Sequence, residues 1–183
     1  MLGIAASLTS MVAGYTHADP DQQEELEAIH LRAQNLRRTA LQLADDDAEA
    51  SHAFGAAFKL ERGPARDDAV RAAAVGAAES SAVLGDHAIE AIEDVAWLAQ
   101  YGNRALIADV VVAFGALRAA VAGARTNVSF DLATLRSAGS TLDEIKQQHP
   151  ELWATTQRLD AAIARIDAAT DAVDHRAAPT DSH

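Results

Sequence analysis

Apolar residues recur at alternating spacings of three and four along the first third of the chain, which is the pattern of one face of an α-helix. This stripe contains Leu26, Ile29, Ala33, Leu36, Ala40 and Leu43, and its rhythm continues through Asp47, Ala50, Phe54 and Ala57. Asp47 therefore interrupts an apolar seam, whereas Asp45 and Asp46 project to other faces. The pattern predicts a long helix from about Asp21 with Asp47 pointing inward, unless the helix turns outward at this acidic run.

The same spacing, with start and stop signals, predicts further helices. Leu2 to Val12 forms a short apolar helix, and a third helix runs from about Arg66 to Tyr101, because Gly63-Pro64 marks a turn. The last helix is predicted from Leu142 to about Val173. Pro150 is expected to kink that helix or to split it in two.

The segment between Ala105 and Ala124 is apolar on every side, and its charged residues are Asp109 and Arg118. A helix that is apolar all round is typical of a central buried helix. Burial of an ionised Asp without partners costs on the order of several kcal/mol. We therefore expect Asp109 to be neutral, paired or used in chemistry; the structural alternative is an Asp that satisfies a helix N-terminus or an Arg.

Two short segments flank this helix. Gly102 is predicted to end the preceding helix in a left-handed conformation, and Asn103 to cap the next one. The segment from Arg125 to Leu132 is compatible with a helix or with extended chain. Asn127 within it has no helical explanation, and closing a turn is the structural alternative to a role in binding.

Composition favours helix over sheet, because alanine is abundant and aromatic residues make up 4% of the chain. With 183 residues, the chain is long enough for one domain with a core. We predict an all-α, single-domain helical bundle over residues 1–175, and a disordered tail over 176–183.

The net charge of −12 argues against nucleic acid or an anionic membrane as the main partner. A membrane span over Leu106–Ala124 is disfavoured by Asp109 and Arg118. The apolar N-terminus lacks the basic residues of a signal peptide, since the first Lys or Arg is Arg32. We expect a soluble, cytoplasmic protein.

No metal site is expected. The chain has no Cys, and its seven His include no pair at helical i,i+4 spacing. Histidine is a residue type suited to proton shuttling, but the spacing of His52 and His87 does not distinguish them from ordinary histidines.

Four blocks of the chain together resemble the cyclodeaminase/cyclohydrolase family, which includes the C-terminal domain of formiminotransferase-cyclodeaminase and stand-alone methenyltetrahydrofolate cyclohydrolases. The blocks are Met11–Gly14, Asp47–Ala50, Gly102–Asp109 and Asn127–Leu132. Each block is common by itself, so the specificity lies in their joint order around one apolar helix. The resemblance extends from Leu2 to about Val173.

The resemblance implies an all-helical homodimer that binds a tetrahydrofolate one-carbon derivative and needs no metal. The implied reaction is loss of ammonia from formiminotetrahydrofolate with ring closure, or hydrolysis of the methenyl bridge to formyltetrahydrofolate. Both reactions move protons around a cationic amidine-like centre. A carboxylate in a low-dielectric pocket suits that chemistry, because it stabilises the cation and exchanges a proton.

Carried over by position, the resemblance implies that Asp109 and Asp47 are catalytic, as electrostatic or acid–base groups. Gly102, Asn103 and Asn127 are implied to bind and orient the substrate.

Five positions depart from the family pattern. Ala105 and Ala108 stand where the family has Asn and Ser, Asp131 stands where it has Asn, Ser51 replaces a Phe, and a Pro expected near Ser81 is absent. Family members also carry a further helix and a Gly-rich loop ahead of the position of Met1. Either the start codon is misplaced or this protein has lost part of the site.

The departures leave three hypotheses. The first is an enzyme of folate one-carbon metabolism. The second is a non-catalytic binding or assembly protein that retains the family scaffold, and the third is a helical bundle that resembles the family through its alanine content.

Overall fold

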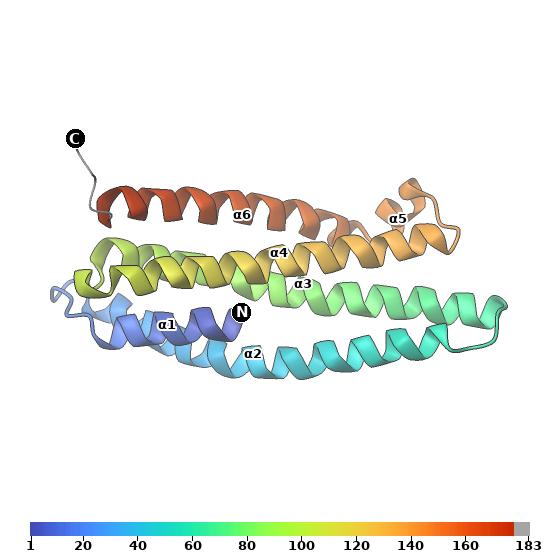
Figure 1. The fold of residues 1–183 in the computed structure, drawn as a ribbon, viewed down its shortest axis with the longest axis horizontal. Helices are drawn as coiled ribbons and strands as arrows, with labels where there is room; N and C mark the ends of the chain where they lie inside the picture. Colours follow the sequence, from blue (N-terminus) through green and yellow to red (C-terminus); the bar gives the residue numbers. More distant parts are fainter. Residues whose placement is uncertain (178–183) are drawn as a thin grey trace.

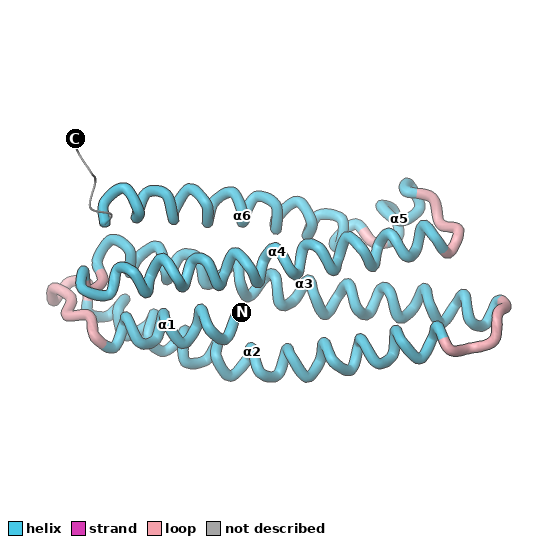
Figure 2. Tube along the Cα trace, in the orientation of Figure 1, coloured by secondary structure: helices cyan, strands magenta, loops and turns pink. Residues whose placement is uncertain are grey.

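In the computed structural model, which describes residues 1–177, every regular element is a helix (Figure 1). The elements are α1 (Leu2–Gly14), α2 (Gln23–Phe58), α3 (Pro64–Tyr101), the 3-10 turn η1 (Arg104–Leu106), α4 (Ile107–Ser137), α5 (Leu142–Gln148) and α6 (Pro150–Ala177). Short loops join them (Figure 2). The all-α prediction is confirmed.

The long helices run side by side (Figure 1). α2 and α3 form a hairpin, α4 packs along α3, and α6 packs against α4 and α3. α1 packs against both α2 and α4. α1 has 13 residues, whereas α2 has 36 and α4 has 31, so α1 covers only one part of the length of these two neighbours (Figure 1).

The buried side chains form two clusters. The larger cluster joins α1, α2, α3, α4 and α6 and contains Phe114, Leu117 and Val121 of α4. The smaller cluster joins α3, α4, α5 and α6 at the other end of the bundle and contains Val128 and Ile145. α2 contributes Leu43 to the larger cluster, and between Leu43 and Ala57 none of its residues is buried.

The prediction of a central buried helix is correct for one side of α4 and wrong for the other. α4 contacts α1, α3 and α6, yet its opposite side faces outward, with Val112 56% and Phe130 71% exposed. Among the described residues, the stretch Arg104–Ser137 is long and apolar enough to cross a membrane, a test that core helices of soluble proteins also pass. We treat α4 as a bundle helix because three helices pack on it.

The ends of the helices test the start and stop residues predicted from the sequence. The chain breaks at Pro150, as expected, and Thr141 with Glu144 forms a reciprocal capping box at the start of α5. Residues 125–132 are helical, so the structural alternative in which Asn127 closes a turn is wrong. The first two residues of the predicted tail, Arg176 and Ala177, belong to α6, and the rest of the tail lies outside the described residues.

Gly102 is extended, with a φ of −72° and a ψ of 172°, so the prediction of a left-handed conformation is wrong. The glycine serves a close approach instead. A Cβ at this position would lie 2.4 Å from the carbonyl oxygen of Leu98. The chain can therefore turn sharply from α3 into η1 only because this residue has no side chain.

Candidate functional site

Two carboxylates from different helices lie close enough to interact electrostatically, near the start of α1. Asp47 lies on α2, about two turns beyond Ala40, whose Cβ would lie 3.6 Å from a Cβ at Gly3 of α1. Asp131 lies on α4, and both side chains are half-buried. Neither makes a hydrogen bond or an ion pair with another residue in the part of the chain that the structure describes. The inward placement predicted for Asp47 is thus partly realised.

The surroundings raise the pKa of Asp131 to about 6. Burial is the larger cause, because it disfavours the charged carboxylate, and the negative charge of Asp47 is the second. A carboxyl group with this pKa changes its charge near neutral pH. Asp131 is not among the site residues expected from the sequence, although it places an acid where the family pattern has an amide.

Asn127 lies one helical turn before Asp131 on α4, so the two side chains project to the same side of the helix. Its side chain is exposed and has no hydrogen-bond partner among residues 1–177. Its amide is free to donate to and accept from a ligand. We refer to Asp47, Asn127 and Asp131 as the acid cluster.

Asn103 is held by the fold. Its side-chain oxygen accepts from the backbone N–H of Ala105 at 3.0 Å, which confirms the predicted cap, and its side-chain nitrogen donates to the carbonyl of Tyr15 at 2.9 Å. Its backbone N–H donates to the hydroxyl of Thr16 at 3.0 Å. Gly102 and Asn103 therefore tie the turn between α3 and α4 to the end of α1.

Asp109 lies in the first turn of α4 and is half-buried. The expectation of a fully buried carboxylate is wrong, because the outer side of α4 is uncovered. Its side chain has no hydrogen bond or ion pair with the other described residues. The positive end of the helix dipole favours an acid here, which fits the structural alternative of an Asp at a helix N-terminus.

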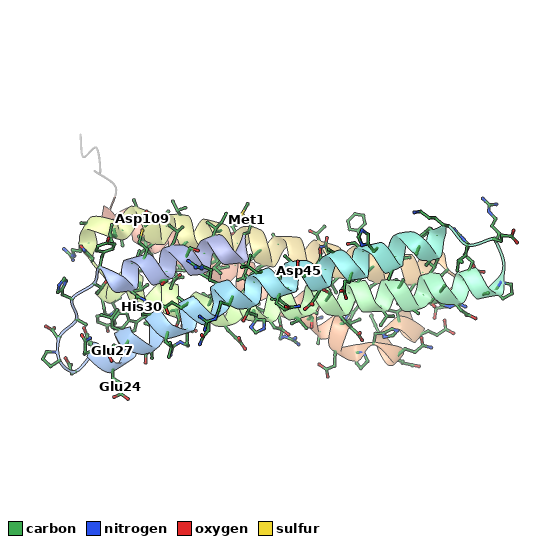
Figure 3. All side chains as sticks on the ribbon, turned by 90° about the horizontal axis from the view of Figure 1, so that it is seen from below. Met1, Glu24, Glu27, His30, Asp45 and Asp109 are labelled. Atoms are coloured by element: carbon green, nitrogen blue, oxygen red, sulfur yellow. The ribbon has the colours of Figure 1, made fainter. Side chains whose placement is uncertain are left out.

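The predicted site residues fall into two groups. Asp47 and Asn127 belong to the acid cluster, whereas Gly102, Asn103 and Asp109 lie near one end of the bundle. Eighteen residues of continuous helix separate Asp109 from Asn127, which corresponds to about 27 Å. Figure 3 places Asp109 near that end and Asp45, a neighbour of Asp47, near the middle. Within one chain, the two groups cannot act on one reacting centre.

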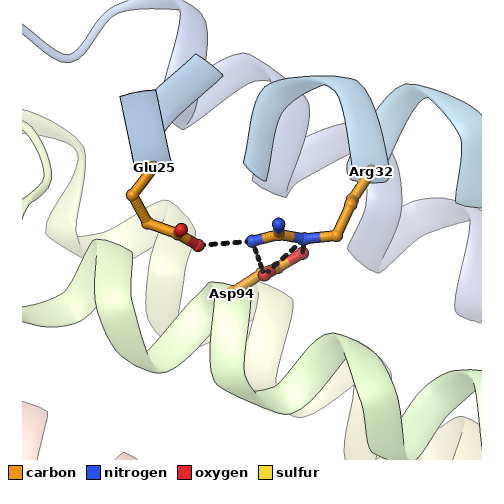
Figure 4. A network of polar contacts seen from close by, with 3 residues as sticks. All are labelled: Glu25, Arg32 and Asp94. Carbon is orange, nitrogen blue, oxygen red and sulfur yellow. Dashed lines mark hydrogen bonds and ion pairs between the residues drawn. The ribbon is translucent and has the colours of Figure 1, made fainter. Parts of the chain in front are cut away.

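A second polar network joins α2 to α3 away from the acid cluster (Figure 4). The guanidinium of Arg32 donates to both oxygens of the buried Asp94, at 2.8–3.2 Å, and to Glu25 at 2.6 Å. The bond to Asp94 is the largest cause of the raised pKa of Arg32. Because each charge has its partner, we assign this network a structural role. Among the described residues, no group of three or more His, Cys, Asp and Glu is arranged to hold a metal.

Comparisons with known proteins relate this chain to a family and to solved structures. The family model of formiminotransferase-cyclodeaminase matches residues 1–149. A solved formiminotetrahydrofolate cyclodeaminase from Thermotoga maritima is similar in structure, with a TM-score of 0.74 and 20% sequence identity over 95% of this chain and 82% of that chain. At this identity, the structural match shows the fold alone. A search of curated proteins found no match.

Proposed function

The chain belongs to the formiminotransferase-cyclodeaminase family, and from this premise we propose that it is an enzyme that releases ammonia from formiminotetrahydrofolate. Family membership supports an enzyme that acts on a folate. The name of the similar Thermotoga protein favours the cyclodeaminase reaction over hydrolysis of the methenyl bridge. The observation that carries the proposal is the acid cluster, in which two helices bring two unpaired carboxylates and one free amide together.

In this reaction, the secondary amine nitrogen beside the pterin ring attacks the formimino carbon and gives up its proton. The formimino nitrogen gains two protons, one from the attacking nitrogen and one from an acid, and its bond to carbon breaks as ammonia leaves. The product is a cation in which the one-carbon unit bridges two nitrogens. A carboxylate close to this carbon stabilises the developing positive charge. The same group can accept a proton from one nitrogen and donate a proton to the other. We assign this role to Asp47 of α2, which has no competing hydrogen bond in residues 1–177.

Asn127 and Asp131 complete the assignment. The free amide of Asn127 is suited to orient the pterin or the one-carbon unit through paired donor and acceptor groups. Asp131, which interacts electrostatically with Asp47, adds a second negative charge above a pH of about 6 and so strengthens the attraction of the cluster for a cation. The resemblance has an amide at this position, so we regard Asp131 as a group that tunes Asp47.

We further propose a cytoplasmic homodimer, as the resemblance implies. Gly102 and Asn103 then act as positioning residues, since their polar groups are engaged within the fold. Asp109 is too far from the acid cluster of its own chain to take part in the same site.

The test compares Asp47→Asn with Asp45→Asn. Asp45 is exposed on the same helix and has no ion pair among the described residues, so its substitution controls for the loss of one negative charge. Ammonia release and the absorbance of the methenyl product are followed with formiminotetrahydrofolate. We expect Asp47→Asn to lower kcat by at least about 100-fold, as is typical for loss of an acid–base group, and Asp45→Asn to retain turnover.

Calorimetric titration with formyltetrahydrofolate, a stable one-carbon folate, separates this proposal from the scaffold alternative. Binding at one site per chain supports a functional folate pocket. Equal turnover of the two variants would refute the role of Asp47. No heat from a folded protein at millimolar ligand would favour a non-catalytic protein on the family scaffold, which the alanines at positions 105 and 108 also favour.

A further inference from the structure

A groove between α1 and α2 carries positive charge, although the net charge of the chain is −12. The two helices pack side by side (Figure 3). The groove has a volume of about 250 Å³ and is lined by Ser10 of α1 and by Gln34, Arg37 and Arg38 of α2. None of these residues belongs to the acid cluster or to the site expected from the sequence. We call this feature the arginine groove.

The sequence around the groove leaves the two arginines without an acidic neighbour. α1 has no charged side chain. Gly3 and Gly14 of α1 lie against α2, and Ser10 is on the same side of α1, seven residues after the first glycine and four before the second. Within α2, the residues three and four positions away from Arg37 and Arg38 include no acid. Small, neutral residues therefore keep the groove open and leave its positive charge uncompensated.

The polar groups of the groove are available to a ligand. Among the described residues, neither Arg37 nor Arg38 forms an ion pair. Arg38 donates to the side-chain oxygen of Asn35, which is a neutral group, and Arg37 makes no side-chain hydrogen bond within residues 1–177. In the same part of the chain, the side chains of Ser10 and Gln34 also have no hydrogen-bond partner. The groove thus presents several free donors at one place.

This set of donors suits an oxyanion. Guanidinium groups bind carboxylate and phosphate oxygens through paired N–H donors, and a hydroxyl and an amide add neutral donors. The negative charge of the whole protein repels anions, so attraction has to come from local positive charges that no acid compensates. The volume of about 250 Å³ corresponds to roughly eight water molecules at about 30 Å³ each, which is enough for a small carboxylate or phosphate.

We propose that the arginine groove binds an oxyanion, a carboxylate or a phosphate group, through Arg37 and Arg38. This group has two sources: a free small anion, or the carboxylate end of a folate bound at the acid cluster. Asp47 follows Arg37 by ten residues of α2, which is about 15 Å along the helix and within a quarter turn around it. A single elongated ligand can therefore reach both places. The second source rests on the proposed function, whereas the anion site itself does not.

Calorimetric titration at low salt with glutarate and with inorganic phosphate tests the groove without any activity. We expect saturable binding of at least one of these anions at one site per chain, weakened at least about tenfold by Arg37→Gln, which corresponds to about 1.4 kcal/mol. Arg62→Gln is the matched control, because Arg62 is exposed between α2 and α3, has no ion pair among the described residues and carries the same charge. Ser10→Leu fills the groove without a change in charge and is expected to weaken binding as well.

Three results would overturn the anion site, with urea unfolding of each variant as the check that it folds. The first is no heat from the folded wild-type chain with either anion at millimolar concentration. The second is equal weakening by Arg37→Gln and Arg62→Gln, which would mean that only the total charge matters. The third is unchanged binding by Ser10→Leu, which would place the anion outside the groove.

Competition distinguishes the two sources of the oxyanion. The anion that binds is titrated into the chain after saturation with formyltetrahydrofolate. Loss of anion binding, together with weaker folate binding by Arg37→Gln, assigns the groove to the carboxylate end of the folate. Unchanged anion binding assigns the groove to a free anion. If formyltetrahydrofolate gives no heat while the anion still binds through Arg37, the proposed function fails and the anion site stands.

Discussion

Ionisation of Asp131 lowers the stability of the folded protein, so the stability depends on pH. Burial and the charge of Asp47 raise its pKa from the ordinary 3.8 to about 6. The folded protein therefore binds a proton between these two pH values that the unfolded chain does not bind. By linkage, the free energy of unfolding is highest at a pH at which Asp131 is protonated in both the folded and the unfolded protein. This free energy falls as the pH rises from about 4 through about 6. The same ionisation adds negative charge to the acid cluster.

Asp131→Asn removes this titration and is expected to stabilise the protein at pH 7 by about 1 kcal/mol, a value reduced for solvent screening of a half-exposed group. The gain should vanish at pH 4, where the wild-type group is neutral. Urea unfolding at both pH values measures it, with Asp45→Asn as the control. An equal gain at both pH values would mean that charge at residue 131 is not the cause.

The same substitution should also change the pH profile of turnover. In the wild type, kcat/KM is expected to rise as the pH increases through about 6, because ionised Asp131 strengthens the attraction for the cationic centre. Asp131→Asn should remove this inflection and keep turnover within about tenfold, because it restores the amide of the family pattern. An unchanged inflection would assign it to another group.

The two asparagines of the predicted site are distinguished by their partners. Asn103 bonds to Ala105 and Tyr15, whereas Asn127 has no partner among the described residues. Asn103→Ala is expected to cost about 1–2 kcal/mol of stability, as for other lost caps, and Asn127→Ala less than about 0.5 kcal/mol. Urea unfolding gives the stabilities, and calorimetry gives folate binding, which Asn127→Ala should weaken. The reverse order of stabilities would exchange the two roles.

At the scale of the elements, the packing of α3 against α4 and α6 depends on one glycine. A Cβ at Gly85 would lie 2.6 Å from Leu159 on α6 and 3.1 Å from Ala124 on α4. Gly76 lies on the same helix and has nothing within 4 Å of such a Cβ. The two positions therefore share a helix and differ only in the space around them.

Alanine at these two positions should act in opposite directions. Gly85→Ala is expected to destabilise the protein by about 1–3 kcal/mol through overpacking, and Gly76→Ala to stabilise it by about 0.5–1 kcal/mol through helix propensity. Thermal unfolding of both variants measures the difference. Stabilisation by Gly85→Ala would show that α6 can move away from α3 without loss.

For the molecule as a whole, the sequence predicted the features that depend on local pattern. The helices, the break at Pro150 and the cap at Asn103 follow from spacing and from side chains that act within a few residues. The exposure of the outer side of α4 was not predicted, because Val112 and Phe130 are apolar and look like core residues in the sequence. Asp131 was also missed, since its pKa depends on Asp47, which is distant in the chain.

The sparse packing of α2 beyond Leu43 has a consequence for local unfolding. Burial holds the first part of this helix, whereas residues 44–56 have no buried side chain. We expect the amide protons of residues 44–58 to exchange with solvent faster than those of residues 26–43, which mass spectrometry after deuterium labelling can measure. Equal rates would show that α2 opens as one unit. Asp47 sits just past the boundary, so a bound folate would slow exchange in the half of the helix that opens first.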